Sequence, residues 1–440
     1  MLRKLEYGCL VASIGLIGAD RIDLAAGHLP FILTPFLVLA PMVILLHFIR
    51  AAPSRLFQFA ITTPIRRQAP FVAAASLFFL FSFASIPLGL DPARGFVAFP
   101  DMLLVAIFAY YILSRILTEP DQKRLVLHSI TFALTAYLVF CVGEFIGWQL
   151  GFTGDYTRSG PWIETTFAPS ELGGLVPLLS GTTYDPNRSG FILTMYLILI
   201  DSFIPKSRFA PCFRFVIAFL ILLSLSRSST LCWLTYYLFS RTFWAIFTSR
   251  RAVLRLAAIA SVILIICVAC QEQIGGLVEA WRIADVVSAK LSMDPGSSGD
   301  SHVLLIQRGL QTWLMSPKTM VSGIGFAATP RVVEDFFGND KHGNFHCLYV
   351  TALAEMGLPA FLVLMFLLCY PIIGRNGALR GMAAVMAFNI SYQVHMEAMF
   401  WLILALLWSY KRNEVPLLRF LVYRSDAPAH HSFDRQPKRA

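Results

Sequence analysis

Residues 345–373 read FHCLYVTALAEMGLPAFLVLMFLLCYPII, and Glu355 is the only Asp, Glu, Lys or Arg among them. A run of this length and composition can cross a bilayer as a single helix. Similar apolar runs recur from one end of the chain to the other, separated by short charged segments. The stretch therefore predicts a membrane protein that crosses the bilayer many times.

The composition of the whole chain supports the same class. Of the 440 residues, 57% are hydrophobic and 14% are charged, and the mean hydropathy is +0.65. A soluble domain carries about 25% charged residues, and it could not bury this much apolar surface. We expect an all-α, polytopic integral membrane protein that forms a single membrane domain over residues 1–440, with about twelve transmembrane helices. The predicted spans are 7–19, 29–49, 70–89, 96–114, 125–150, 189–204, 213–226, 230–248, 253–270, 345–373, 380–396 and 398–410.

The distribution of charge predicts how the chain is oriented. If the N-terminus is inside, the inner segments hold 25 of the 36 Lys and Arg residues and 7 of the 26 Asp and Glu residues. Such an excess of bases on the inner side is the positive-inside pattern of membrane proteins. The net charge of +10 is therefore explained by topology, and no nucleic-acid partner is expected. We expect a bacterial inner (cytoplasmic) membrane protein with both termini in the cytoplasm and the bilayer as a partner.

One long connection, residues 271–343, interrupts the pattern of short loops, and it falls on the outer, periplasmic side. Loops of this length are usually functional or disordered. Apolar residues recur at helical spacing over 277–291, and a second helical run is predicted over 302–315. Amphipathic helices beside a membrane lie on its surface or cap a cavity, and a covering loop without chemistry is an equally valid reading of this pattern alone.

Polar residues collect at the outer ends of the predicted spans. Asn187 and Arg188 open the sixth span, and Arg227 occupies the turn between the seventh and eighth. A charge near membrane depth is costly unless it is functional or paired. Arg227 is therefore either part of a site, or a structural arginine that reaches the interface or pairs with Asp101 or Glu144.

Several arginines on one side of the membrane indicate an anionic ligand. Guanidinium groups bind phosphate oxygens in a bidentate manner, and Arg308 in the long loop adds to Arg188 and Arg227. His342 and His346 lie four residues apart before the tenth span. On its own such a pair is more typical of a polar loop. Beside arginines, a neutral histidine can accept a proton from an attacking hydroxyl while the arginines stabilise a leaving phosphate.

Several common sites are absent from the sequence. There is no GxxxxGK[ST] loop, no HExxH, no GxSxG and no DxD motif, so ATP-driven transport and the simplest intramembrane proteases are not indicated. Cys267 and Cys270 form a CxxC inside an apolar run, without a second pair or a histidine at zinc spacing. We expect no metal and no cofactor, and the energy for any reaction should reside in the substrate.

Four motifs, in order, resemble the O-antigen polymerase/O-antigen ligase superfamily of bacterial surface-polysaccharide enzymes. They are Asp185-Pro186-Asn187 at the start of a span, Ser226-Arg227 in a turn, Arg308 with Trp313 and Gly323-Ile324-Gly325-Phe326 in the long loop, and His346 followed by Glu355-Met356-Gly357-Leu358-Pro359. The resemblance covers roughly residues 180–373. The N-terminal half is similar only in hydropathy.

The resemblance implies a metal-independent glycosyl transfer on the periplasmic face. The donor would be an oligosaccharide linked to undecaprenyl diphosphate, and other polysaccharide-assembly proteins are further candidate partners. His346, Arg227 and Arg308 would be the catalytic residues. Arg188, Asn187, His342 and Glu355 would bind the substrate.

The sequence departs from the family pattern at one important position. Cys347 stands where the family has an asparagine after the histidine. Asn344 is a candidate to replace it from the other side, and His342 is an alternative to His346 as the working histidine.

The lead hypothesis is a repeat-unit polymerase for exopolysaccharide, capsule or O-antigen. A ligase that transfers the finished glycan to a lipid core is the alternative within the family. A polysaccharide-related transporter is the alternative from another class, but it should place paired charges near the bilayer midplane, often on broken helices. Here the polar residues gather toward one face, which favours catalysis at a surface.

Overall fold

The computed structural model describes residues 1–25, 33–50, 64–150, 158–159, 162–163, 179–224, 226–240, 298–337, 344–372 and 376–410. The regular secondary structure within these ranges is helical, apart from a pair of two-residue antiparallel strands, β1 (Arg158–Ser159) and β2 (Trp162–Ile163). The all-α prediction is confirmed for this part of the chain.

Each predicted span that falls on described residues overlaps a helix, and the span predicted over 253–270 lies outside them. The described helices up to residue 240 are α1 (Leu2–Gly15), α2 (Pro35–Arg50), α4 (Pro64–Ser85), the 3-10 turn η1 (Ile86–Leu88), α5 (Pro92–Thr118), α6 (Gln122–Gln149), α7 (Pro186–Phe203), α8 (Ala210–Leu223) and α9 (Arg227–Leu238). Those described after residue 297 are α14 (Ser298–Leu314), α15 (Pro317–Ser322), α16 (Thr329–Phe337), α17 (Leu348–Cys369), the turn η2 (Tyr370–Ile372), α18 (Asn376–Phe388) and α19 (Ala398–Ser409).

Four helical segments within the described ranges are long and apolar enough to cross a membrane. They are Gln68–Leu88, Pro92–Thr118, Gln122–Gln149 and Leu348–Ile372. The helices α2, α8, α18 and α19 are apolar but shorter. The expectation of about twelve spans is thus supported for four of them.

Polar side chains mark where several of these helices begin. Asp91, Asp121 and Asp185 accept a hydrogen bond from a backbone N–H in the first turn of α5, α6 and α7, and Ser226 does the same for α9. Such a cap satisfies one of the N–H groups that have no partner within the helix. The caps fix the first residues of α7 and α9, where two of the motifs lie.

The C-terminal helix α19 forms the centre of the bundle. Every residue from Ala398 to Trp408 is buried, as expected for a helix that is apolar all round. The outer faces of α4, α5 and α17 instead expose large apolar side chains, among them Leu80, Ile107 and Leu362. Exposed apolar surface of this kind marks an interaction surface.

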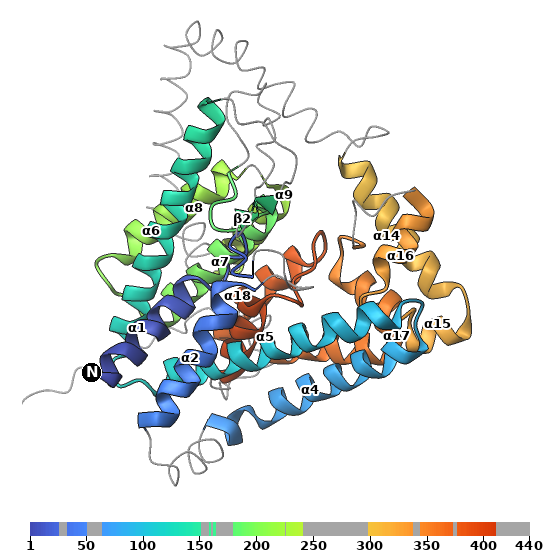
Figure 1. Ribbon diagram of the computed structural model, residues 1–440, viewed down its shortest axis with the longest axis horizontal. Coiled ribbons are helices and arrows are strands. Elements are labelled where there is room, and N and C mark those ends of the chain that lie inside the picture. The colour runs from blue at the N-terminus through green and yellow to red at the C-terminus, as the bar shows by residue number, and fades with distance from the viewer. Residues whose placement is uncertain are drawn as a thin grey trace, which may run out of the picture.

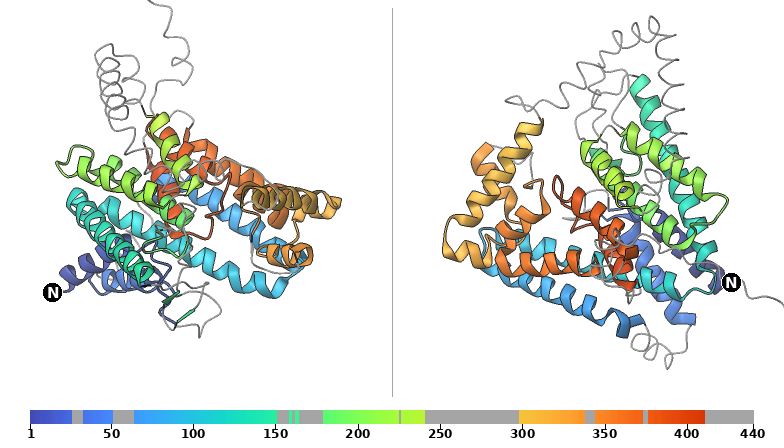
Figure 2. Two further views of the ribbon diagram at one scale, coloured as in Figure 1. Left: turned by 90° about the horizontal axis from the view of Figure 1, so that it is seen from above. Right: turned by 180° about the vertical axis from the view of Figure 1, so that it is seen from behind.

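The helices α14, α15 and α16 form a separate group at one end of α4, α5 and α17, away from the N-terminus (Figures 1 and 2). Helices α14 and α16 share a small apolar core with the start of α17, which includes Leu305, Val333 and Phe345. The helix predicted over 302–315 is confirmed as α14. The helix predicted over 277–291 lies outside the described residues.

The predicted span 380–396 is wrong in its second half. Helix α18 ends at Phe388, and residues 389–397 form a non-helical connection to α19. The backbone N–H of Leu348 donates to the carbonyls of Asn389 and Tyr392, so this connection packs against the start of α17. Hydropathy missed the break because apolar residues continue on both sides of it.

Candidate functional site

Segments that are far apart in the sequence meet at the starts of α7 and α9. The hydroxyl of Ser226 donates to Oδ1 of Asn187 at 2.6 Å, and the hydroxyl of Tyr392 donates to Oδ2 of Asp185 at 2.9 Å. The first contact joins two of the sequence motifs, and the second attaches the connection 389–397 to one of them. Oδ1 of Asn187 therefore holds the start of α9 against the start of α7.

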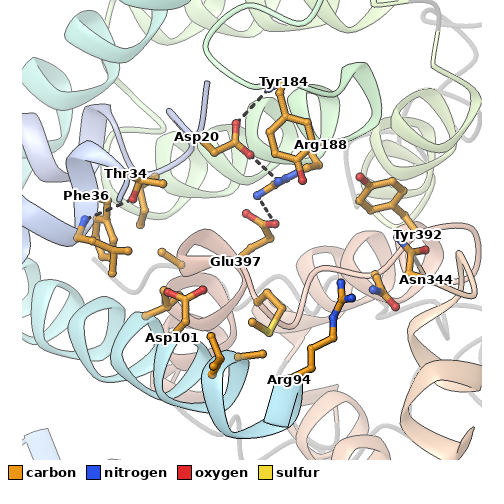
Figure 3. A pocket seen from close by; sticks show the side chains of 18 of the residues that line it. Asp20, Thr34, Phe36, Arg94, Asp101, Tyr184, Arg188, Asn344, Tyr392 and Glu397 are labelled. Carbon is orange, nitrogen blue, oxygen red and sulfur yellow. Dashed lines mark hydrogen bonds and ion pairs between the residues drawn. The ribbon is translucent and has the colours of Figure 1, made fainter. Parts of the chain in front are cut away.

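A cavity of about 770 Å³ lies beside this junction (Figure 3). It is enclosed by the loop after α1, the starts of α2, α5 and α7, residue Asn344, and the connection 389–397. Four carboxyl groups and two guanidinium groups line it: Asp20, Asp91, Asp101, Glu397, Arg94 and Arg188. Aromatic rings of Phe36, Tyr184 and Tyr392 complete the wall. The cavity thus offers both anion-binding and hydroxyl-binding groups.

Arg188 lies at the centre of this cavity, between two carboxylates (Figure 3). Its Nη1 is 2.6 Å from Oδ2 of Asp20, and its Nη2 forms an ion pair with Glu397. The guanidinium also lies over the ring of Tyr184, 4.5 Å from the ring centroid. Its Nε is buried without a hydrogen-bond partner. Sequence reasoning placed Arg188 at an anion site, and the structure shows that two protein anions already hold it.

The charge of Asp20 depends on this arrangement. Asp20 lies in the loop after α1 and accepts the backbone N–H of Tyr184 at 3.1 Å. Burial raises the pKa of Asp20 to about 7, because the effect of desolvation and of the nearby Glu397 outweighs the stabilising charge of Arg188. Asp20 can therefore gain or lose a proton near neutral pH.

His346 stands next to this cavity and is held in a strained backbone conformation. Its φ is 52°, a region that non-glycine residues rarely occupy. The side chain of Asn344, which lines the cavity, accepts the backbone N–H of His346 at 2.7 Å. The ring of His346 lies 4.2 Å from that of His302 on α14 and 6.1 Å from that of Tyr392. Asn344, proposed as the replacement for the missing asparagine, thus positions His346 through its backbone.

Arg308 is half-buried on α14, on the turn that contacts the segment before α17. The next residue, Gly309, packs so closely that a Cβ there would lie 2.3 Å from Val350 and 3.0 Å from Phe345. This close approach places the helix that carries Arg308 and His302 beside His346.

Arg227 is the first residue of α9 and is exposed. The next residue, Ser228, accepts a hydrogen bond from Ser391 at 2.7 Å, so the turn contacts the connection that lines the cavity. Glu144, one of the two acids considered as its structural partner, forms an ion pair with Arg21 at 2.6 Å.

Glu355 has a different setting from the other predicted site residues. It is buried, and its carboxylate accepts the backbone N–H groups of Ala327 and Thr329 at 3.0 Å and the hydroxyl of Thr329 at 2.5 Å. Thr329 begins α16, where a carboxylate is favoured by the helix dipole. The contacts make Glu355 a positioning residue for α14, α15 and α16, named the outer helices after the side of the membrane that the sequence predicts for them. His342 lies outside the described residues.

The glycines of the two motifs explain why Glu355 sits there. Gly323 and Gly357 have φ values of 69° and 78°. A Cβ on Gly323 would lie 2.2 Å from the carbonyl oxygen of Glu355, and one on Gly357 would lie 2.1 Å from that of Val321. Only glycine permits both the conformation and the approach, so the two motifs interlock and attach the outer helices to α17.

Sequence reasoning missed several cavity residues, although a signal was present for two of them. Arg94 lies in the short connection between the third and fourth predicted spans, which the sequence predicts to be outside. A base there departs from the predicted charge asymmetry, as Arg227 does. Asp101 is an acid inside a predicted span, which by itself suggests function, yet it was considered only as a partner for Arg227. Asp20 and Glu397 carry no local signal, because their role depends on meeting Arg188.

In the part of the chain that the structure describes, no group of three or more His, Cys, Asp or Glu residues could hold a metal ion. The pair Cys267 and Cys270 lies outside that part. The chemistry that the described cavity offers is hydrogen bonding, charge stabilisation and proton transfer.

No model of a known protein family matches the chain. No curated protein matches it either.

Proposed function

We propose that this chain is a membrane-embedded polysaccharide repeat-unit polymerase. It transfers glycan from undecaprenyl diphosphate to an acceptor hydroxyl at the periplasmic face of a bacterial inner membrane, in the synthesis of exopolysaccharide, capsule or O-antigen. The resemblance of four motifs over residues 180–373 is the source of the proposal. The enzyme is a glycosyltransferase without a metal.

One observation carries the proposal furthest. Two of the motif segments reach the cavity of about 770 Å³, through Arg188 beside Asn187 and through Asn344 before His346. Arg227 and Arg308 are not among the residues that line it. The contacts of Asn187 with Ser226, of Ser228 with Ser391, and of His346 with His302 join these segments. Contacts between motif segments that are far apart in the sequence support a common site.

The proposed reaction uses the groups present. The oxygen of an acceptor hydroxyl attacks the anomeric carbon of the donor, and the bond from that carbon to the diphosphate oxygen breaks. The electron pair stays on the diphosphate, where guanidinium groups stabilise it. The hydroxyl proton goes to His346, or to a cavity carboxylate such as Asp20. Arg94, which lines the cavity, joins Arg227 and Arg308 as a candidate partner of the diphosphate.

A transporter is the second candidate, and one observation favours it. Asp101 lies within the spanning helix α5 and lines the same cavity as Asp20 and Glu397. Carboxylates within membrane spans often carry protons or ions. A transporter would move lipid-linked glycan or an ion without joining sugars, so a test for chain growth separates the two functions.

The proposed topology has both termini in the cytoplasm and the helices α14, α15 and α16 in the periplasm. Its support is the excess of Lys and Arg on the inner segments. Cysteine labelling from the outside, in a variant without native cysteines, should reach a cysteine placed at Ser298 and not one at Ser425. Labelling of Ser425 alone, or of both, would contradict the orientation.

The test of function is chain growth with lipid-linked repeat units as the sole substrate. Purified protein should produce a ladder of lengthening chains on a sizing gel. The variants Arg227→Ala, Arg308→Ala and His346→Ala should each lower the rate of chain growth by a factor of about a hundred to a thousand. Arg331→Ala is the matched control, because Arg331 is exposed on α16 and pairs with Glu334; it should leave the rate unchanged.

Other outcomes identify the alternatives. Single units that are converted only when a lipid-core acceptor is added would make the protein a ligase. The absence of any glycosidic product with either acceptor would favour transport. If His346→Ala retains activity and either His342→Ala or His302→Ala does not, the assignment of the histidine is wrong.

A further inference from the structure

A second polar cavity, of about 310 Å³, lies at the opposite ends of the helices that form the first one. The first cavity is bounded by the end of α1 and the starts of α2 and α5. The second is bounded by the start of α1 and the ends of α2 and α5. It therefore faces the other side of the bundle, and the residues described so far do not contribute to it.

Three arginines from three helices meet at this second cavity. Arg3 comes from α1, Arg50 from α2 and Arg115 from α5. The side chain of Arg115 is 6% exposed and forms the floor, whereas those of Arg3 and Arg50 are 73% and 37% exposed and form the rim. The depth of Arg115 and the accessibility of the other two make a pocket that a small group can enter from outside.

The buried carboxylate of Glu6 holds part of this arrangement in place. Its Oε2 is 2.7 Å from Nε of Arg50, and its Oε1 is 2.9 Å from Nη2 of Arg115 and 3.1 Å from Nδ1 of His47. Glu6 thus orients two guanidinium groups without using all of their N–H donors. Nη1 of Arg115 donates to Thr118 at 3.2 Å.

One donor at the floor of the cavity is unsatisfied. Nε of Arg115 is buried and has no hydrogen-bond partner. Buried polar groups nearly always have a partner, so an exception requires an explanation. The missing group must be an acceptor. The lining carries three arginines against the two acids Glu6 and Glu119. Glu119 lies 4.0 Å from Arg3 and 3.7 Å from Arg115, so each arginine has an acid neighbour, and the one positive charge in excess favours an acceptor with negative charge.

We propose that this second cavity binds a phosphate group, with Arg115 at its floor and Arg3 and Arg50 at its rim. Guanidinium groups match phosphate oxygens in geometry and charge. The phosphate can belong to the headgroup of an anionic lipid or to a free phosphate, since both present the same oxygens. The proposal does not depend on the reaction proposed for the first cavity.

The experiment measures retained ligand by native mass spectrometry of the purified full chain in detergent. The probes are phosphatidylglycerol, phosphatidylcholine and inorganic phosphate, each added separately. The protein should retain at least one of phosphatidylglycerol or inorganic phosphate more strongly than phosphatidylcholine. Arg50→Gln and Arg3→Gln should each weaken that retention by about tenfold, the effect of losing one charged hydrogen bond.

The matched control is Arg208→Gln. Arg208 is an exposed base in the connection between α7 and α8, and its loss changes the net charge by the same amount. Retention of phosphatidylglycerol alone would assign a lipid headgroup, and retention of inorganic phosphate alone would assign a soluble ligand. Retention of neither, or an equal loss in Arg208→Gln, would overturn the proposal. Because the rim arginines are exposed, their variants should fold, and chain growth reports independently on the first cavity.

Discussion

The contacts of Arg188 with Asp20 and Glu397 predict an asymmetry in stability that a double-mutant cycle can test. One guanidinium bridges two carboxylates. Arg188→Gln removes the positive charge and leaves two neighbouring carboxyl groups in a buried site. Glu397→Gln instead leaves one ion pair with no net charge, in which Nη1 of Arg188 is 2.6 Å from Oδ2 of Asp20. The arginine should therefore matter far more than either acid.

The expected magnitudes follow from burial. The three side chains are 7–13% exposed, so solvent screens them little. Removing one partner of a buried ion pair costs about 3–5 kcal/mol, and Arg188→Gln should lower the free energy of unfolding by an amount in this range. Glu397→Gln should cost no more than about 1 kcal/mol, because removal of its charge also lowers the pKa of Asp20 and strengthens the remaining pair.

The assay is thermal unfolding of each variant in one detergent at constant pH, with the double variant Arg188→Gln/Glu397→Gln included. The double variant should be more stable than Arg188→Gln, since only one carboxyl then lacks a partner. Arg214→Gln is the control. Asp201 contacts both Arg214 and Arg380, so in this variant the carboxylate still has Arg380 as its partner. If Glu397→Gln destabilised the protein as much as Arg188→Gln, the reasoning would be refuted.

Three further predictions address the cavity and the attachment of the outer helices. Arg94→Ala should slow chain growth by a factor of about a hundred or more if this guanidinium contacts the diphosphate, whereas an effect no larger than that of Arg331→Ala would remove it from the site. The folded pKa of Asp20, about 7, exceeds the unfolded value of about 3.9, so its contribution to stability is present at acid pH and is lost as pH rises through 7. Unfolding temperatures between about pH 5 and about pH 8 should fall less steeply in Asp20→Asn than in the parent, and parallel curves would contradict this. Gly357→Ala should lower the free energy of unfolding by more than about 2 kcal/mol, because Gly357 has a positive φ and a Cβ there would lie 2.1 Å from the carbonyl oxygen of Val321. Gly8→Ala is the control, since Gly8 has open space around it, and it should stabilise α1 by up to about 1 kcal/mol. Equal unfolding temperatures for the two variants would contradict the tight packing of Gly357 against Val321.

Local features of the sequence determined where most described helices lie. Apolar runs predict α5, α6 and α17 because the preference of each side chain for lipid is a property of that residue. The starts of α7 and α9 follow from Asp185 and Ser226, since a capping side chain acts within one turn. The sequence also shows which kinds of polar residue the motifs contain, namely arginine, histidine and asparagine near the ends of apolar runs.

Tertiary structure alone decided which of these residues act together. Asp20, Arg188 and Glu397 come from three segments, and nothing near any one of them in the sequence indicates the other two. The sequence places Glu355 inside a predicted span, but in the structure its carboxylate accepts hydrogen bonds from Thr329 and caps α16. Apolar helix faces are nearly interchangeable in lipid, and which faces meet depends on the shapes of the small and large residues on both. The sequence therefore determined the helices and the kinds of polar groups at their ends, while the packing of those helices decided which charges were paired and which lined a cavity.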